Sequence, residues 1–118
     1  MNILVVDDDW NLCTGLSHFL ERQGYTVYSA ADALQALDVL EREPIGLVIT
    51  DYLMPHVDGI RFTEMLKADE RFKSIPVLLI TASVDGTVTD QGMRKGVALT
   101  LQKPVDMSQL LNLVRFAE

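Results

Sequence analysis

Short runs of apolar residues alternate along the chain with longer stretches in which apolar residues recur every three or four positions. Each short run is rich in Val, Ile or Leu and is too short for a helix, which is typical of a buried strand. These runs lie at 3–6, 26–28, 47–50, 77–80 and 97–101. The longer stretches predict helices over 10–23, from Asp32, from Asp58, over 84–95 and from Asp106 almost to Glu118.

Residues at the expected helix ends support this division. Asp32 and Asp58 can each cap a helix start, and Asp106 with Gln109 three residues later resembles a capping box. Gly24 stands where the first helix would end in a left-handed residue. The stretch 84–95 holds two glycines and only a thin apolar stripe, which makes it the weakest predicted helix.

Strands that alternate with helices predict right-handed crossovers, and therefore a doubly wound α/β fold. We expect a five-stranded parallel sheet with five helices on its two faces, a flavodoxin-like three-layer sandwich. The run at 26–28 is short and polar, which places it at a sheet edge and gives the strand order 2-1-3-4-5. With 118 residues the chain has room for one core, so we expect a single domain over 1–118.

Composition narrows the classes of partner. A net charge of −7 argues against direct binding to nucleic acid or to an anionic membrane, because both require a basic face. No apolar run approaches the ~20 residues of a membrane span, and the single cysteine has no partner for an internal disulfide. We therefore expect a cytoplasmic protein. The acidic residues are concentrated in the first half of the chain.

Polar residues follow four of the five predicted strands. Asp7 and Asp8 follow the first, Asp51 the third, Thr81 the fourth and Lys103 the fifth. Each alone has an ordinary explanation, such as a solvated turn or a surface lysine before a proline. In the order 2-1-3-4-5, however, three carboxylates would converge where the strand order reverses. Clustered carboxylates repel one another unless a cation joins them, and such an oxygen-rich site suits Mg²⁺.

The same residues predict phosphoryl chemistry. A carboxylate beside Mg²⁺ and a lysine is a plausible nucleophile toward phosphorus, because the two cations stabilise charge on the phosphoryl oxygens. Asp51 stands alone at its strand end and is the better candidate for the acceptor, while Asp7 and Asp8 would hold the metal. Thr81 could donate its hydroxyl to a phosphoryl oxygen.

Four segments resemble the receiver domain of bacterial response regulators, and together they span essentially the whole chain. They are 3–9, 48–59, 79–82 and 103–104, which read ILVVDDD, VITDYLMPHVDG, LITA and KP. The resemblance implies that Asp51 accepts a phosphoryl group from a sensor histidine kinase or a histidine phosphotransfer protein. It also implies a phosphoprotein of two-component signal transduction rather than a turnover enzyme.

Further site roles follow from the resemblance alone. Asp8 would bind Mg²⁺ directly and Asp7 mainly through water, with Asp51 and the backbone carbonyl of Leu53 completing the protein ligands. Three groups would contact the phosphoryl group: the Thr81 hydroxyl, the Ala82 backbone N–H and the Lys103 ammonium. The Lys103–Pro104 peptide bond is expected to be cis.

The resemblance also implies how the signal would leave the domain. A downstream effector protein, or a C-terminal output domain absent from this sequence, would read a switched surface. A homodimer through the 84–118 face is a further possibility. In the family an aromatic residue three positions before the lysine usually moves with the threonine, and here that position is Thr100. The switch pair is therefore Thr81 and Thr100, and we expect segment 84–95 and the fifth strand to carry the readout.

Two other positions depart from the usual pattern. Leu53 and Ser83 flank the path of the hydrolytic water in the family, and an apolar Leu53 offers no group to orient that water. We therefore expect a long-lived phosphoaspartate. Trp10 stands where many members have proline; it either lies near the metal site or serves as a partly exposed packing residue.

Three alternative functions fit parts of the pattern. An aspartyl phosphatase would need an acid two residues after the nucleophile, where this chain has Leu53. A flavodoxin-like FMN carrier would need a Ser-, Thr- and Gly-rich phosphate loop after the first strand, where the three aspartates would repel phosphate. A receiver-like protein-interaction module that works without phosphorylation remains open because of Thr100.

Overall fold

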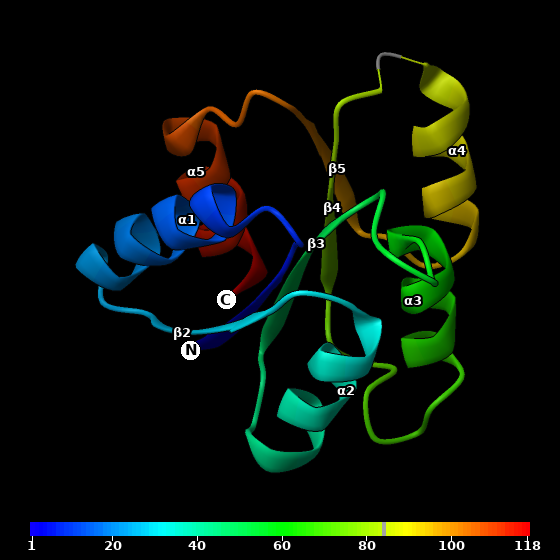
Figure 1. The fold of residues 1–118 in the computed structure, drawn as a ribbon, viewed down its shortest axis with the longest axis horizontal. Helices are drawn as coiled ribbons and strands as arrows, with labels where there is room; N and C mark the ends of the chain where they lie inside the picture. Colours follow the sequence, from blue (N-terminus) through cyan, green and yellow to red (C-terminus); the bar gives the residue numbers. More distant parts are fainter. Residues whose placement is uncertain (84) are drawn as a thin grey trace.

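A computed structural model describes residues 1–83 and 85–118 as five strands that alternate with five helices (Figure 1). The strands are β1 (Asn2–Val6), β2 (Thr26–Ala30), β3 (Leu47–Asp51), β4 (Val77–Thr81) and β5 (Leu99–Gln102). The helices are α1 (Trp10–Arg22), α2 (Ala33–Arg42), α3 (Gly59–Lys67), α4 (Gly86–Arg94) and α5 (Met107–Ala117). The predicted alternation of elements is confirmed.

All four strand pairings are parallel, and the sheet has the order β2-β1-β3-β4-β5. Helices α1 and α5 cover one face, whereas α2, α3 and α4 cover the other (Figure 1). This is the predicted doubly wound, three-layer fold. The strand order reverses between β1 and β3, whose neighbouring carboxyl ends carry the candidate site.

The central strands are apolar throughout because both of their faces are buried. In β1, Ile3 and Val5 belong to the core under α1 and α5, while Leu4 and Val6 belong to the core under α2 and α3. All four are fully buried, as is Phe62 of α3. The edge strand β2 has only its last residue, Ala30, fully within the core, which explains its polar sequence.

Aspartate residues cap the helices as the sequence predicts. The side chains of Asp32, Asp58 and Asp106 each accept a hydrogen bond from a backbone N–H in the first turn of the following helix. Two further caps, Asp9 for α1 and Asp85 for α4, were not predicted. Five of the acidic residues therefore serve the helix starts, where a negative charge is favourable.

The last strand differs from its predicted range of 97–101. It begins two residues later, at Leu99, because the chain leaves α4 through Gly96 in the left-handed region at φ 106°. The Val97 N–H donates to the Gly92 carbonyl at 2.8 Å, and the Val97 side chain packs beside Leu79. In the sequence, an apolar residue in the turn that ends α4 thus looks like the first residue of a strand.

Other boundaries shift by small amounts. The predicted helix 84–95 is observed as Gly86–Arg94, and residue 84 of that range lies outside the described residues. Strand β2 extends to Ala30 rather than ending at residue 28. Within the described ranges, none of the helices combines the length and the apolarity that crossing a bilayer requires.

Candidate functional site

The carboxyl ends of β1 and β3 bring Asp7, Asp8 and Asp51 together. One carboxylate oxygen from each lies within 4.8 Å of the others. Asp7 and Asp51 are buried, with 4% and 8% of their surfaces exposed, whereas Asp8 is exposed. The convergence predicted from the strand order is therefore present, with two buried acids and one at the surface.

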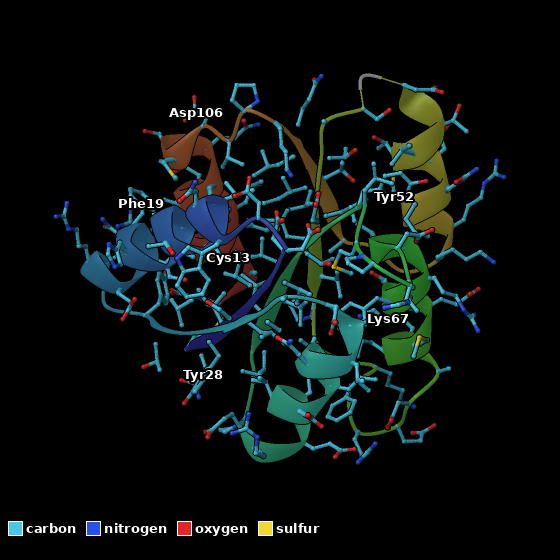
Figure 2. The ribbon with its side chains drawn as sticks, in the orientation of Figure 1. Cys13, Phe19, Tyr28, Tyr52, Lys67 and Asp106 are labelled. Carbon is cyan, nitrogen blue, oxygen red and sulfur yellow. The ribbon has the colours of Figure 1, made fainter. Side chains whose placement is uncertain are left out.

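Backbone hydrogen bonds hold the buried acids in place. The Tyr52 N–H donates to Asp51 Oδ1 at 2.9 Å and also to the Ile80 carbonyl at 2.9 Å. The Asp9 N–H donates to Asp7 Oδ1 at 2.8 Å. These contacts fix both carboxylates relative to the sheet. In Figure 2, Tyr52 lies beside α3 and α4, where it packs against the small core cluster around Leu79.

A buried thiol donates a hydrogen bond to the backbone of Asp7. Cys13, on the inner face of α1, donates its S–H to the Asp7 carbonyl at 3.2 Å (Figure 2). Burial raises the pKa of the Cys13 thiol to about 11, and the nearby Asp7 charge adds to this effect. The side chain therefore stays a neutral donor at physiological pH. No role in the site was predicted for it from the sequence; its position in the first turn of the helix that follows Asp7 was the available signal.

Lys103 reaches the acidic cluster from the loop after β5. Its Nζ lies 3.2 Å from Asp51 Oδ1 and 3.5 Å from Asp7 Oδ2. Burial alone would lower the pKa of Lys103, but the hydrogen bonds and charges of Asp51 and Asp7 outweigh it and leave this pKa raised. The lysine is therefore a permanent cation within the site. The Lys103–Pro104 peptide bond is cis, as expected.

A hollow of about 390 Å³ opens beside Asp51. It is lined by Asp51, Tyr52, Leu53, Thr81, Ala82, Ser83, Val88 and Lys103. The Thr81 hydroxyl accepts a hydrogen bond from the Ser83 N–H at 3.0 Å, so it already has one partner. The structure thus gathers around one hollow the acceptor candidate and all three groups expected to contact a phosphoryl group.

Thr100 lies away from this hollow. It pairs with Leu79 in the sheet register, and its Oγ1 is buried without a hydrogen-bond partner among the described residues. A buried hydroxyl of this kind costs free energy. Thr100, which the sequence analysis paired with Thr81 as a switch residue, is therefore a partly buried polar side chain of β5 that does not line the hollow.

The charges in the site are unequal. Three carboxylates face one lysine at this position. Burial raises the pKa of Asp7, and the neighbouring charges of Asp51 and Asp8 raise it further, against the lowering effects of the Asp9 N–H and Lys103. A clustered set of oxygen ligands with excess negative charge fits a hard divalent cation such as Mg²⁺.

We expect Asp7→Asn to raise the melting temperature of the metal-free protein at pH 7 by several degrees. Because the pKa of Asp7 is higher in the folded protein, its proton stabilises the fold below the unfolded pKa near 3.8, and this contribution disappears as the pH rises through the folded value. Asparagine carries no charge, so the Asp7→Asn variant avoids the free-energy cost of burying an ionised carboxylate at neutral pH.

The measurement is thermal unfolding in a chelator at pH 7 and at pH 3.5, where the gain should shrink. Asp38→Asn is the matched control, because Asp38 is exposed on α2. An equal gain in both variants would show that only the net charge matters.

The fold and the site together define a doubly wound α/β domain of the CheY-like, flavodoxin-like type, with an acidic cluster and a lysine at the carboxyl edge of its sheet. A sequence profile of the response regulator receiver domain matches residues 3–115. The chain belongs to this family, and it is a receiver domain of two-component signal transduction.

Individual relatives agree with this assignment. The chain is 39% identical to the response regulator Rre1 of Synechocystis sp., covering 98% of this chain and 50% of that protein. It is 29% identical to the sporulation initiation phosphotransferase F of Bacillus subtilis, covering 96% and 90%. The structure of the chemotaxis response regulator CheY4 of Vibrio cholerae superposes with a TM-score of 0.92 at 27% identity, covering 99% and 98%. The chain thus spans about half the length of Rre1 and almost all of the phosphotransferase.

Proposed function

We propose that residues 1–118 form a phosphoacceptor domain that takes a phosphoryl group onto Asp51 in a Mg²⁺-dependent reaction. The donor is a sensor histidine kinase or a histidine phosphotransfer protein. The observation that carries this proposal is the position of Asp51, which is buried, 3.2 Å from Lys103 Nζ, and at the mouth of the hollow that Thr81 and Ala82 also line. The relative named a phosphotransferase supports the same chemistry.

In the proposed transfer, an Asp51 carboxylate oxygen attacks phosphorus and forms an O–P bond. The P–N bond to the donor's imidazole breaks, and the imidazole nitrogen leaves with the electron pair of that bond. Lys103 stabilises the negative charge on the phosphoryl oxygens.

We assign the Mg²⁺ ligands to Asp7, Asp8, Asp51 and the backbone carbonyl of Leu53. When bound, the ion would supply positive charge that offsets the carboxylates and the phosphoryl oxygens. Asp8 is the exposed ligand and Asp7 the buried one. With the ion and Lys103, the three carboxylates are balanced, which is the charge argument for a divalent rather than a monovalent cation.

Phosphorylation is proposed to act as a switch through Thr81. A phosphoaspartate carries nearly one more negative charge than the carboxylate it replaces. Its oxygens would accept a hydrogen bond from the Thr81 hydroxyl, whose oxygen now accepts one from the Ser83 N–H just before α4. Reorienting Thr81 would release that N–H and alter the start of α4, so α4 and β5, including Thr100, would carry the readout.

The proposed signal passes to a partner outside these residues. This is a downstream effector protein or a C-terminal output domain, and a homodimer through the face formed by residues 85–118 is the alternative arrangement. The domain itself would act in the cytoplasm and would lose its phosphoryl group slowly without being a turnover enzyme. Neither direct nucleic-acid binding nor membrane binding is part of the proposal, because the chain is strongly acidic.

The experiment that tests this function is phosphorylation by a small donor. The protein is incubated with acetyl phosphate and Mg²⁺, and its intact mass is measured with and without excess chelator. We expect one adduct of about 80 Da that requires Mg²⁺. A chain that stays unmodified under conditions where it is folded would instead favour the interaction module without phosphorylation, an alternative left open by Thr100 at the position where the family usually has an aromatic residue.

Leu53→Asn is expected to shorten the lifetime of the phosphorylated form severalfold. Leu53 is 70% exposed and lines the hollow beside Asp51, where its apolar side chain gives an attacking water no hydrogen-bond partner. An amide would orient such a water, while the backbone carbonyl would be retained. The decay of the mass adduct after removal of the donor measures the lifetime, and a slower decay in the variant would contradict this role.

A further inference from the structure

The rim of the site carries an exposed tryptophan beside acidic residues. Trp10 is the only tryptophan of the chain and the first residue of α1, and 76% of its surface is exposed. It borders a second hollow, of about 110 Å³, on the opposite side of the acidic cluster from the hollow described above. The lining residues are Asp7, Asp8, Trp10, Cys13, Ser29, Ala30, Ala31 and Gln35.

Two further carboxylates lie around this second hollow, in addition to the three of the acidic cluster that Mg²⁺ and Lys103 would neutralise. Asp9, next to Trp10, and Asp32, next to Ala31, are helix caps whose side chains accept backbone N–H groups. Neither takes part in an ion pair within the described parts of the chain. The indole ring therefore lies in an acidic environment that would attract a cation to its face.

Two more apolar side chains are exposed at the same edge of the sheet. Leu34, in the first turn of α2, is 74% exposed, and Leu53, in the loop after β3, is 70% exposed. Trp10 and Leu34 lie in the first turns of α1 and α2, and Leu53 lies in the loop after β3, so each of the three follows the carboxyl end of a strand. Exposed apolar groups framing a polar centre are typical of a surface that a protein partner covers.

We propose that Trp10, with the neighbouring carboxylate of Asp9, receives a lysine or arginine side chain of the phosphodonor protein, and that Leu34 and Leu53 make apolar contacts with the same partner. This inference rests on the proposed function, because a donor that brings a phosphohistidine to Asp51 must cover this rim. The part of the donor protein that packs on the Trp10 ring faces nearby carboxylates, so a basic side chain is the complementary group there. A small donor such as acetyl phosphate has no such side chain and would not contact Trp10.

The test compares two donors on the same variants. One donor is acetyl phosphate, and the other is the purified, phosphorylated histidine domain of a sensor kinase from the same organism, chosen as the one that transfers fastest to the wild-type chain. We expect Trp10→Ala to lower the second-order rate constant for the protein donor by about tenfold, with no change in the rate for acetyl phosphate. Trp10→Phe should retain most of the activity, and Trp10→Lys should lose more than the alanine variant.

Phe116→Ala is the matched control. Phe116 is an aromatic residue with 85% of its surface exposed, but it lies near the end of α5, next to Ala117. Ala117 lines a hollow together with Leu47 and Val77, the first residues of β3 and β4, at the end of the sheet opposite to the acidic cluster. The rates of the Phe116→Ala variant should match the wild type with both donors. Equal rates for Trp10→Ala and wild type with the protein donor would overturn the inference, and so would a loss of rate with acetyl phosphate. Failure of the wild type to react with acetyl phosphate would overturn the proposed function itself.

Discussion

Asp51→Asn is expected to abolish the phosphorylated form altogether. Asparagine has nearly the same shape and can still accept the Tyr52 N–H, which donates to Asp51 Oδ1 in the native chain. Its amide is a far weaker nucleophile than a carboxylate, and it also removes one of the negative charges that would hold Mg²⁺. The substitution therefore separates the chemistry at this position from its structural role.

The measurement is the yield of the mass adduct of about 80 Da after incubation with acetyl phosphate and Mg²⁺. Asp58→Asn is the control in the same loop, because Asp58 caps α3 and is not part of the acidic cluster. It should lose some stability, while its yield at a temperature where it is folded should match the wild type. An adduct of undiminished yield on Asp51→Asn would show that another side chain is the acceptor.

Gly59→Ala is expected to lower the free energy of unfolding by about 3 kcal/mol or more and the melting temperature by roughly 10 °C or more. A Cβ at Gly59 would lie 2.2 Å from the Asp51 carbonyl oxygen and 2.8 Å from a Leu79 methyl group. The glycine N–H also donates to the Tyr52 carbonyl at 2.7 Å, so the start of α3 cannot move away from the residue that follows β3 without losing this bond.

Gly15→Ala provides the control for this change. Gly15 lies within α1, and a Cβ there would meet no atom within 4 Å. The same substitution should therefore stabilise the protein by roughly 0.5–1 kcal/mol through helix propensity. Chemical denaturation of both variants measures the two effects. A loss at Gly59 no larger than the change at Gly15 would mean that the approach of α3 to Asp51 is not close.

The site depends on this close approach. Gly59 begins α3 directly against the backbone of Asp51, so the helix start and the end of β3 form one rigid unit. We expect Gly59→Ala to slow phosphorylation as well, because a displaced Asp51 carbonyl would move the carboxylate relative to Lys103. Destabilisation and loss of activity should thus appear together in this variant.

Much of the fold could be predicted because the relevant signals are local. Strands β1, β3 and β4 are buried on both faces and read as continuous apolar runs, and the aspartate caps mark the starts of the helices. The fifth strand was placed wrongly at Val97, since burial of one apolar side chain in a turn looks the same in a sequence as burial in a strand. Only the left-handed turn at Gly96 separates the two cases.

The convergence of Asp7, Asp8 and Asp51 was predictable because the ends of neighbouring parallel strands must meet. What the sequence could not supply were distances and surroundings. The contact of Gly59 with Asp51 and the thiol of Cys13 beneath Asp7 arise from the packing of helices on the sheet. The exposure of Trp10 likewise depends on where α1 lies.

The most direct measurement is to identify the residue that carries the phosphoryl group. The protein is phosphorylated with acetyl phosphate and Mg²⁺ and then treated with borohydride, which reduces an aspartyl phosphate to homoserine. Proteolysis and mass spectrometry of the peptides then locate the change. We expect homoserine at position 51 and unmodified aspartate at positions 7 and 8. A phosphoryl group on another aspartate or on His56, or its absence from every peptide, would contradict the assignment of Asp51 as the phosphoacceptor.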